Sequence, residues 1–280
     1  MPPSRGGHKD LIALVIIGRD FNVKKDFSES ICDICERYDI EYSDRIYGSV
    51  SLENPERLIA VAAGWRWLIN ESFYQIIVLH DSLLPRYRGF NPMVTALLNR
   101  DPEIGVTAII ANKDFDCGDI IDSRAVAVRY PIKIAEAIRM VSILYFDIAQ
   151  SLLSKLSDSG RLEGSPQDEA SASYSVWRDE EDYKIDWAGS ADFIVHFINC
   201  FSFPFKGAST VCDNQLLHIL EADTEPDVNV ANRDVGKVIF LTRYGKPVVI
   251  CGRGLLRIDL AVDDDGNSVL PLKKFRSRLK

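Results

Sequence analysis

One histidine and one aspartate stand out in this chain because each follows an apolar, strand-like run. His80 ends the run 76–80, and Asp116 follows the run 105–110. The loop SLLPRYRGFNP separates the histidine from a helix-like run at 93–98. Ligands bind at the carboxyl ends of strands in open α/β sheets, so we expect the two side chains to meet across one cleft. A histidine beside a carboxylate can take up and release a proton near neutral pH.

Both residues also have a simpler interpretation. A histidine at a strand end can be bonded to a backbone carbonyl, and an aspartate shortly before Gly118 can be an ordinary turn residue. The residues around them form a long and specific string, HDSLLPRYRG at 80–89, Pro92 and FDCGD at 115–119. This string favours a functional site over two unrelated structural residues.

The same string resembles the folate-dependent formyltransferases, a family that includes methionyl-tRNA formyltransferase, glycinamide ribonucleotide transformylase and the sugar N-formyltransferases. The resemblance implies transfer of a formyl group from 10-formyltetrahydrofolate to a primary amine, with His80 and Asp116 as catalytic residues. In this chemistry the amine attacks the formyl carbon directly, so the site needs an oxyanion donor and a proton shuttle. Histidine suits both tasks, and the aspartate would orient it and favour its charged form.

The resemblance also implies which residues meet the folate, and it implies no metal ion. The family places the backbone of 67–69 at the pterin edge and uses the loop 112–116 to bind folate. The folate-contacting residues implied in this way are Trp67, Leu68, Ile69, Phe90, Asn112, Lys113, Asp114 and Phe115. From residue type alone, the tryptophans 65 and 67 would be interpreted as packing residues.

Two features depart from the family pattern. Val78 stands where the family carries an asparagine, two residues before the histidine, whose amide is thought to hold the formyl oxygen. Loss of one such donor typically costs about 10²–10³ in turnover. A protonated His80, a backbone N–H, Asn91 or Asn112 are the alternatives for that task. Secondly, the family's first strand and helix have no counterpart at the front, which predicts a mis-assigned start codon or a truncated chain.

The pattern of apolar residues predicts the scaffold that positions the site. The segments 10–18, 25–38, 40–46, 55–63 and 76–80 favour the order strand, helix, strand, helix, strand. This order predicts an α/β fold with a doubly wound, mostly parallel sheet, as in the Rossmann-like formyltransferases. Further helices are predicted at 91–99, 132–155 and 191–201, and further strands at 105–110, 120–128, 216–221, 236–241, 247–251 and 255–260.

Two domains are predicted, a catalytic domain at 1–188 and a small C-terminal β domain at 189–280. Residues 157–172 are rich in Ser, Gly, Asp and Glu, which is typical of a surface linker. The family places a barrel like the oligonucleotide-binding fold at the C-terminal end. That name describes a topology and does not imply binding of nucleic acid.

Composition limits the possible classes of protein. The 280 residues are 46% hydrophobic and 26% charged, which is ordinary for a soluble globular protein. No apolar run approaches the roughly 20 residues of a membrane helix, and no signal peptide is present, so a cytoplasmic location is expected. Of six cysteines, only Cys32 and Cys35 have CxxC spacing, and no second pair follows to complete a zinc site. Ordinary thiols in a reducing cytosol are expected.

The predicted acceptor is a nucleotide-linked amino sugar. The chain resembles the sugar N-formyltransferases most closely at 174–187, and Arg86, Arg88 or Lys113 could meet a diphosphate. The net charge of −8 argues against binding of nucleic acid through phosphate neutralisation. The alternatives are a methionyl-tRNA formyltransferase and a non-catalytic protein that binds folate or nucleotide sugars. A homodimer is expected, because sugar-modifying relatives are often dimers.

Overall fold

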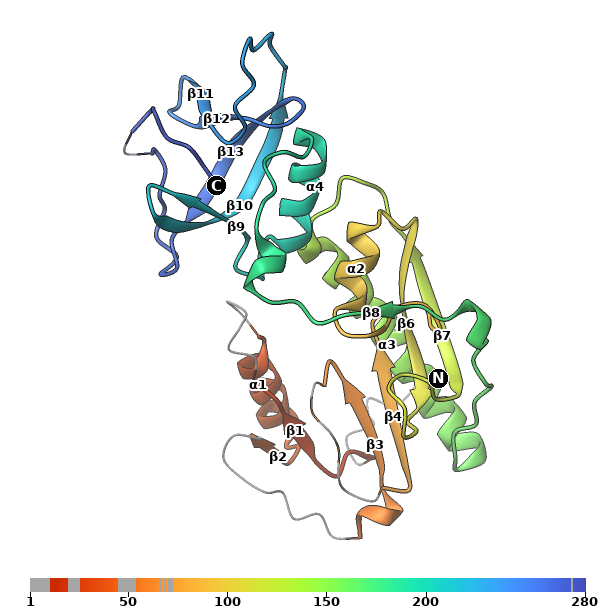
Figure 1. Ribbon diagram of the computed structural model, residues 1–280. Helices are drawn as coiled ribbons and strands as arrows, with labels where there is room; N and C mark the ends of the chain where they lie inside the picture. Colours follow the sequence, from red (N-terminus) through yellow and green to blue (C-terminus); the bar gives the residue numbers. More distant parts are fainter. Residues whose placement is uncertain are drawn as a thin grey trace, which may run out of the picture.

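The described part of the chain forms two lobes, each built on a β-sheet and joined through one helix (Figure 1). The computed structural model describes residues 11–19, 26–44, 54–65, 67, 69, 73–272 and 274–280. In the N-terminal lobe the elements are β1 (Val15–Ile17), α1 (Ser28–Tyr38), β2 (Tyr42–Asp44), η2 (Pro55–Arg57), β3 (Ile59–Ala63), β4 (Gln75–His80), β5 (Arg88–Gly89), α2 (Pro92–Leu98), β6 (Glu103–Ile110), β7 (Ile120–Ala127), α3 (Ile134–Ser159), η3 (Glu169–Ser171), β8 (Tyr174–Ser175) and η4 (Glu180–Tyr183).

The N-terminal lobe contains a mixed sheet of strand order β3-β4-β6-β7. Strands β3 and β4 are parallel, whereas β6 is antiparallel to both of its neighbours. The loop 111–119 between β6 and β7 is too short for a parallel crossover, which needs a dozen or more residues. The predicted α/β class is confirmed, with parallel pairing in β1–β2 and β3–β4 and antiparallel pairing at β6 and β7.

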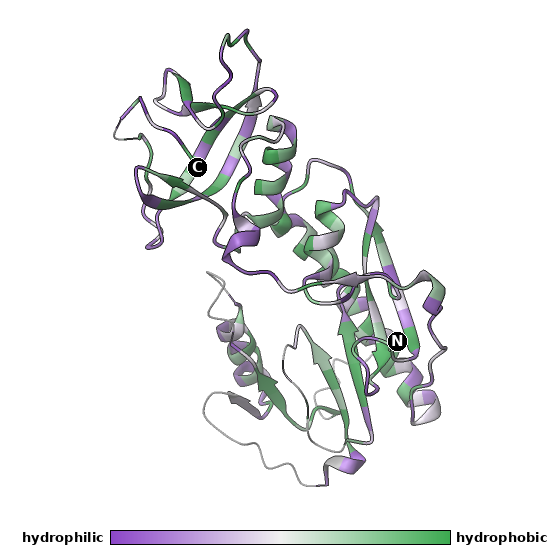
Figure 2. Cartoon of the chain, in the orientation of Figure 1, coloured by the Kyte–Doolittle hydropathy of each residue, from purple (hydrophilic) through white to green (hydrophobic). Residues whose placement is uncertain are grey.

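One predicted element has a different secondary structure. The segment 55–63 was expected as the second helix, but only η2 is helical there, and Ile59–Ala63 is strand β3. All five residues of β3 pair in register with β4, from Ile59 opposite Gln75 to Ala63 opposite Leu79. Pairing with a buried strand therefore overrides the helical interpretation of an alanine-containing apolar run. Figure 2 shows β3 and β4 mostly in the colour of hydrophobic residues.

A long amphipathic helix, α3, covers the sheet and buries one face against β6 and β7. Its buried side chains recur at helical spacing and are Ile134, Ala137, Val141, Leu144, Ile148 and Leu152. Among the described residues, α3 is the one helix that is long and apolar enough to span a membrane. Its buried face belongs to the largest apolar core of the N-terminal lobe, which is the packing of a core helix.

The front of the described chain is a small β-α-β unit. Strands β1 and β2 are parallel and form a two-stranded sheet of their own, with α1 between them in the chain. In α1 the side chain of Cys35 is buried, whereas Ile31, Ile34 and Tyr38 are 40–54% exposed. Residues 10, 25 and 45–46 of the predicted elements lie outside the described residues. All six cysteines are free thiols.

The C-terminal lobe is an antiparallel sheet of strand order β11-β12-β13-β10-β9, packed against α4. Its elements are α4 (Ala191–Phe201), β9 (Ala208–Cys212), β10 (Gln215–Glu225), β11 (Val238–Leu241), β12 (Pro247–Ile250) and β13 (Leu255–Val262). Helix α4 joins the two lobes, because Phe201 packs in the core of the first lobe and Ile194 and Ile198 pack in that of the second. The predicted domain boundary at 188 remains a prediction.

Candidate active site

His80 ends strand β4, and its imidazole ring is contacted from two sides. Its Nε2 lies 2.9 Å from the carbonyl oxygen of Tyr87, and its Nδ1 lies 3.6 Å from Oδ1 of Asp116. The residue is 7% exposed. A carbonyl oxygen only accepts hydrogen bonds, so Nε2 carries a proton, and Nδ1 is the nitrogen that can accept one. The carbonyl contact of the structural interpretation is seen at Nε2, and the expected meeting with Asp116 is seen at Nδ1, while a catalytic role remains a prediction.

Asp116 reaches the histidine from the turn between β6 and β7. Its backbone is in the left-handed region, with φ 55°, and its Oδ2 accepts a 2.8 Å hydrogen bond from the backbone N–H of Gly89. The turn is tight at Gly118, where a Cβ atom would lie 1.7 Å from the carbonyl oxygen of Ile110. Only glycine fits this position, so the glycine fixes the place from which the carboxylate approaches.

The histidine and the aspartate line one cleft of about 1050 Å³ that extends to the C-terminal lobe. Of the predicted folate residues, Phe90 and Phe115 also line it. The residues Trp67, Ile69, Asn112, Lys113 and Asp114 do not line it, and Leu68 lies outside the described residues. The ring of Trp67 packs edge-on against Trp65, with centroids 4.9 Å apart, and Trp65 itself lines the cleft. The assignment of folate contacts remains a prediction.

Val78, which stands where the family carries an asparagine, lines the cleft. Asn91 also lines it and is one of the residues that could hold the formyl oxygen instead. Asn91 is half-buried, precedes helix α2 and has a left-handed backbone. Within the described residues its side-chain amide makes no recorded hydrogen bond, and it therefore has a donor available to a ligand. Asn112 instead accepts a 3.0 Å hydrogen bond from the backbone N–H of Asp114 and does not line the cleft.

The segment 162–175, called the strap below, is bound to the site along its length, although 157–172 was predicted as a surface linker. It runs from the end of α3 to β8 and is drawn in green in Figure 1. Ser165 forms two 2.8 Å backbone hydrogen bonds with Ile120, and Tyr174–Ser175 pair with Arg88–Gly89 as β8 and β5. The segment lies at the surface, as predicted, but it is bonded to the rest of the lobe and is not a free linker. Its polar side chains Gln167, Glu169 and Ser173 bond the loops that follow β4 and β6.

Gln167 of the strap holds the turn that carries Asp116. Its Nε2 donates to the carbonyl oxygens of Asp116, at 2.7 Å, and of Gly118, at 2.8 Å. Its Oε1 accepts two hydrogen bonds from the Arg88 guanidinium, at 2.8 and 3.1 Å. Sequence reasoning missed this glutamine, because its partners lie 49 to 79 positions away along the chain.

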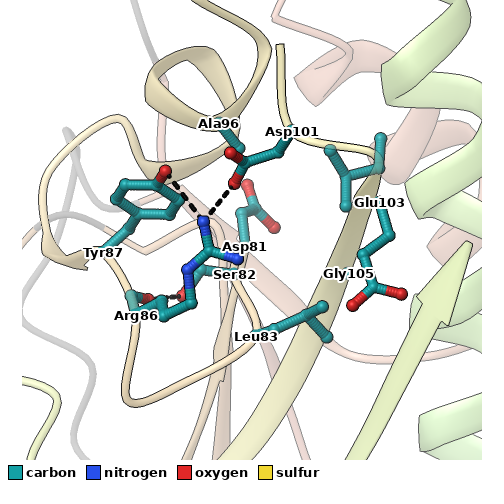
Figure 3. Close-up of a pocket in the computed structure, with 10 residues that line it drawn as sticks. Asp81, Ser82, Leu83, Arg86, Tyr87, Ala96, Asp101, Glu103 and Gly105 are labelled. Carbon is teal, nitrogen blue, oxygen red and sulfur yellow. Dashed lines mark hydrogen bonds and ion pairs between the residues drawn. The ribbon is translucent and has the colours of Figure 1, made fainter. Parts of the chain in front are cut away.

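The two arginines of the loop 82–89 are both paired. Arg88 is 1% exposed and forms a bidentate ion pair with Glu169, with N···O distances of 2.7 and 2.8 Å. Arg86 donates to Asp101, at 2.7 Å, and to the Tyr87 hydroxyl, at 3.1 Å (Figure 3). Both arginines therefore anchor the loop. The three guanidinium nitrogens of Arg88 are all bonded, and Arg86 does not line the cleft.

A half-buried carboxyl group, that of Asp81, directly follows the histidine in the chain. Asp81 lines the cleft and accepts a hydrogen bond from the hydroxyl of Tyr145 on α3. Burial raises the pKa of the Asp81 carboxyl, and burial together with this carboxyl raises the pKa of the Tyr145 hydroxyl. The pair can share a proton, which lowers the cost of a carboxylate in this position.

Family profiles and curated proteins point to one family. A profile described as formyl transferase matches residues 41–136, and one described as its C-terminal domain matches residues 178–279. A methionyl-tRNA formyltransferase of Carboxydothermus hydrogenoformans is 29% identical over 84% of this chain and 76% of its own length. Another, of Nitrosomonas europaea, is 30% identical over 81% of this chain and 72% of its own length.

Solved structures share the fold at low sequence identity. HypX of Aquifex aeolicus, solved with tetrahydrofolic acid, matches 92% of this chain and 45% of its own, with a TM-score of 0.66 and 16% identity. WlaRD, a sugar 3N-formyl transferase solved with dTDP and 5-N-formyl-THF, matches 89% of this chain and 97% of its own, with a TM-score of 0.54 and 17% identity.

Proposed function

The chain belongs to the folate-dependent formyltransferase family, and we propose that it formylates the primary amine of a nucleotide-linked amino sugar. The family uses 10-formyltetrahydrofolate as the formyl donor. The observation that carries the proposal is the pairing of His80 Nδ1 with Asp116 at the end of a strand and inside a large cleft. The acidic chain and the shared fold of a complete sugar formyltransferase support a small acceptor over a nucleic acid.

The histidine and its neighbours form a proton-transfer unit. Nδ1 of His80 accepts the proton that the attacking amine must lose, since Nε2 already carries a hydrogen toward the Tyr87 carbonyl. The charged ring is then stabilised by Asp116 on one side and by this carbonyl on the other. The same proton would pass to the folate nitrogen as its bond to the formyl carbon breaks. The Gly89 N–H holds the second oxygen of Asp116, so the carboxylate keeps its orientation while the ring changes charge.

The residues of the cleft fit a folate. The exposed side chains of Phe90 and Phe115, together with Trp65, provide flat apolar surfaces for the fused rings of a folate. The cleft is large enough to hold the folate and a nucleotide-linked acceptor together. When bound, 10-formyltetrahydrofolate supplies the formyl carbon. Asn91 is the side chain best placed to donate a hydrogen bond to the developing oxyanion, because its amide is unengaged and Val78 has none.

The proposed acceptor class is tested by release of tetrahydrofolate from 10-formyltetrahydrofolate with a panel of nucleotide-linked amino sugars. We expect turnover with one sugar and none with its N-acetylated form, which lacks the nucleophilic amine. The full chain and its Asp116→Asn variant are compared under the same conditions. Equal rates with every sugar and with buffer alone would contradict the proposal.

The second candidate function is formylation of methionyl-tRNA, because curated relatives with 29–30% identity bear that name. Binding of initiator tRNA in a salt series separates the two. Phosphate contacts make the logarithm of the binding constant fall steeply with the logarithm of the salt concentration. We expect no specific tRNA binding at physiological salt.

The remaining alternative is a protein that binds folate without catalysis. Such a protein would bind 10-formyltetrahydrofolate but would release no tetrahydrofolate with either acceptor. Homodimer formation and a cytoplasmic location remain predictions.

A further inference from the structure

Two segments of the C-terminal half form one part of the wall of the cleft. One segment is 176–183, which follows β8, and the other runs from 205 through β9 to His218 in β10. Arg178, Lys206, Ser209 and His218 of these segments are called the acceptor wall below. Ser209 and His218 are direct neighbours on paired strands, so their side chains share one face of the sheet.

Three polar atoms of the acceptor wall are buried without a partner. They are Nε of Arg178, Oγ of Ser209 and Nδ1 of His218. Ser209 is 3% exposed and His218 is 5% exposed, so neither residue lies on the open surface. Buried polar groups in native proteins are nearly always hydrogen-bonded, and three exceptions lining one cleft indicate a missing ligand.

The other groups of the wall define the chemistry of that ligand. His218 is held by a 2.8 Å contact between its Nε2 and Asp264, which directs Nδ1 to the unpaired side. Lys206 and Arg178 have no recorded carboxylate partner among the described residues, in contrast to Arg86 and Arg88. Asp179 lies beside them, but its Oδ1 caps η4 by accepting from the N–H of Glu181 at 2.9 Å.

An exposed aromatic residue adjoins these cations. Trp177 precedes Arg178, lines the cleft and is 63% exposed. The Arg178 guanidinium lies 5.7 Å from the ring centre of Phe201, which fixes its stem against α4. Two cations, a hydroxyl, an imidazole and an exposed indole together suit a phosphorylated ligand with an aromatic base.

We propose that the acceptor wall is the binding subsite for the diphosphate of a nucleotide-linked acceptor, with Trp177 beside the base. Arg178 and Lys206 contact the phosphate oxygens. Ser209 donates to an adjoining phosphate oxygen, and Nδ1 of His218 accepts from a sugar hydroxyl, since its Nε2 donates to Asp264. In one respect this assignment rests on the proposed function, namely that the acceptor is nucleotide-linked. The subsite places the diphosphate in the C-terminal half of the cleft and the amine at His80.

The test measures binding and needs no turnover. Isothermal titration with UDP, dTDP, CDP, GDP and ADP is carried out on the full chain in the presence of tetrahydrofolate. We expect one of these nucleotides to bind, and we expect Arg178→Met and Lys206→Met each to weaken it by about tenfold, as for loss of a hydrogen bond to a charged group. Arg243→Met removes an exposed charge from the turn between β11 and β12, away from the cleft, and should leave the affinity unchanged.

Two further variants separate binding from folding. Arg178→Lys keeps the charge but removes Nε, so we expect a smaller loss than with methionine. Ser209→Ala should weaken nucleotide binding severalfold while leaving the melting temperature equal or higher, because it removes an unpaired buried hydroxyl. Unchanged affinity in the Arg178, Lys206 and Ser209 variants would overturn the subsite.

The outcomes also distinguish this proposal from the proposed function. Nucleotide binding that depends on the acceptor wall, without formyl transfer to any amino sugar, would support the subsite and contradict the function. Formyl transfer to an amine without binding of any of the five nucleotides would support the function's chemistry and overturn the subsite. Binding of tRNA alone, with a steep salt dependence, would overturn both.

Discussion

The two ends of the cleft are built in opposite ways. At the end that contains His80, the Asp116 carboxylate accepts a hydrogen bond from the backbone of Gly89. The side chain of Gln167 bonds the loop that carries Asp116, and Arg88 bonds Gln167. At the acceptor wall, Arg178, Ser209 and His218 each keep a buried polar atom without a partner. The first arrangement is made within the chain, and we propose that a ligand completes the second.

This contrast follows from what each end has to do. Catalytic groups stabilise a transition state best when their geometry is fixed in advance, because no reorganisation is then needed during the reaction. A recognition site instead gains affinity when its unsatisfied groups find partners on the ligand, and it rejects ligands that leave them unpaired. Changes at the end that contains His80 should therefore lower turnover, and changes at the acceptor wall should lower affinity.

The largest expected effect is that of His80→Asn. The variant removes the base at Nδ1, and turnover should fall by about 10²–10⁴, the usual contribution of a general base. Nucleotide affinity, measured by titration, should stay within about twofold of that of the unaltered chain, because the acceptor wall is untouched. A parallel loss of affinity would show that the two ends are not separate.

A smaller loss is expected from Asn91→Ala, which tests the replacement for the family asparagine. If this amide holds the oxyanion, kcat should fall by about 10²-fold with little change in KM. Asn99→Ala at the other end of α2 is the matched control, since Asn99 is exposed and bonds the Tyr87 hydroxyl. Full activity of Asn91→Ala would assign the oxyanion to another donor.

Gln167→Ala should lower kcat by about tenfold, because it frees the turn that carries Asp116. Gln167 is a positioning residue, so the informative readout is hydrogen exchange of the amides at 115–119, which should quicken in the variant. Gln150→Ala on the exposed side of α3 serves as the control. Slower turnover with unchanged exchange would contradict a positioning role.

The smallest expected effect is that of Asp81→Asn on the stability of the folded chain. Burial raises the pKa of Asp81 in the folded chain, so the native state binds this proton more tightly than the unfolded state does. Stability is therefore lost as pH rises above about 4, the usual value for the carboxyl. Asp81→Asn should raise the melting temperature at pH 7 by roughly 2–4 °C, and the gain should vanish below about pH 4. An equal gain at both pH values would contradict this origin.

Local patterns predicted those features that depend on local sequence. His80 and Asp116 follow strand-like runs, and both line the cleft with Phe90 and Phe115. Helix α4 was predicted with its observed bounds, because its apolar residues recur at helical spacing. The direction of β6 relative to β4 is not encoded in such a pattern, so their antiparallel pairing could not be predicted, whereas the short loop 111–119 already favours antiparallel pairing of β6 with β7.

The features that were missed depend on contacts between distant residues. Gln167 lies in a polar segment whose composition is that of a linker, and its hydrogen bonds span 49 residues or more. Strand β9 (Ala208–Cys212) was also absent from the prediction, since five mixed residues carry no clear alternation. The unpaired atoms of the acceptor wall can be recognised only once the surrounding side chains are in place.

The strap also constrains how this chain can change in length. It is anchored from Leu162, whose backbone bonds the Gln75 side chain in both directions, to β8. Gly164 lies so close to Asp119 that a Cβ atom would come within 2.7 Å of it. The exposed residues 157–161 can therefore gain or lose residues between homologues. A single insertion between 162 and 167 would shift Gln167 and Glu169 out of register with Arg88, and one between 169 and 174 would strain the pairing of β8 with β5. Length variation in this family should stop where the strap begins.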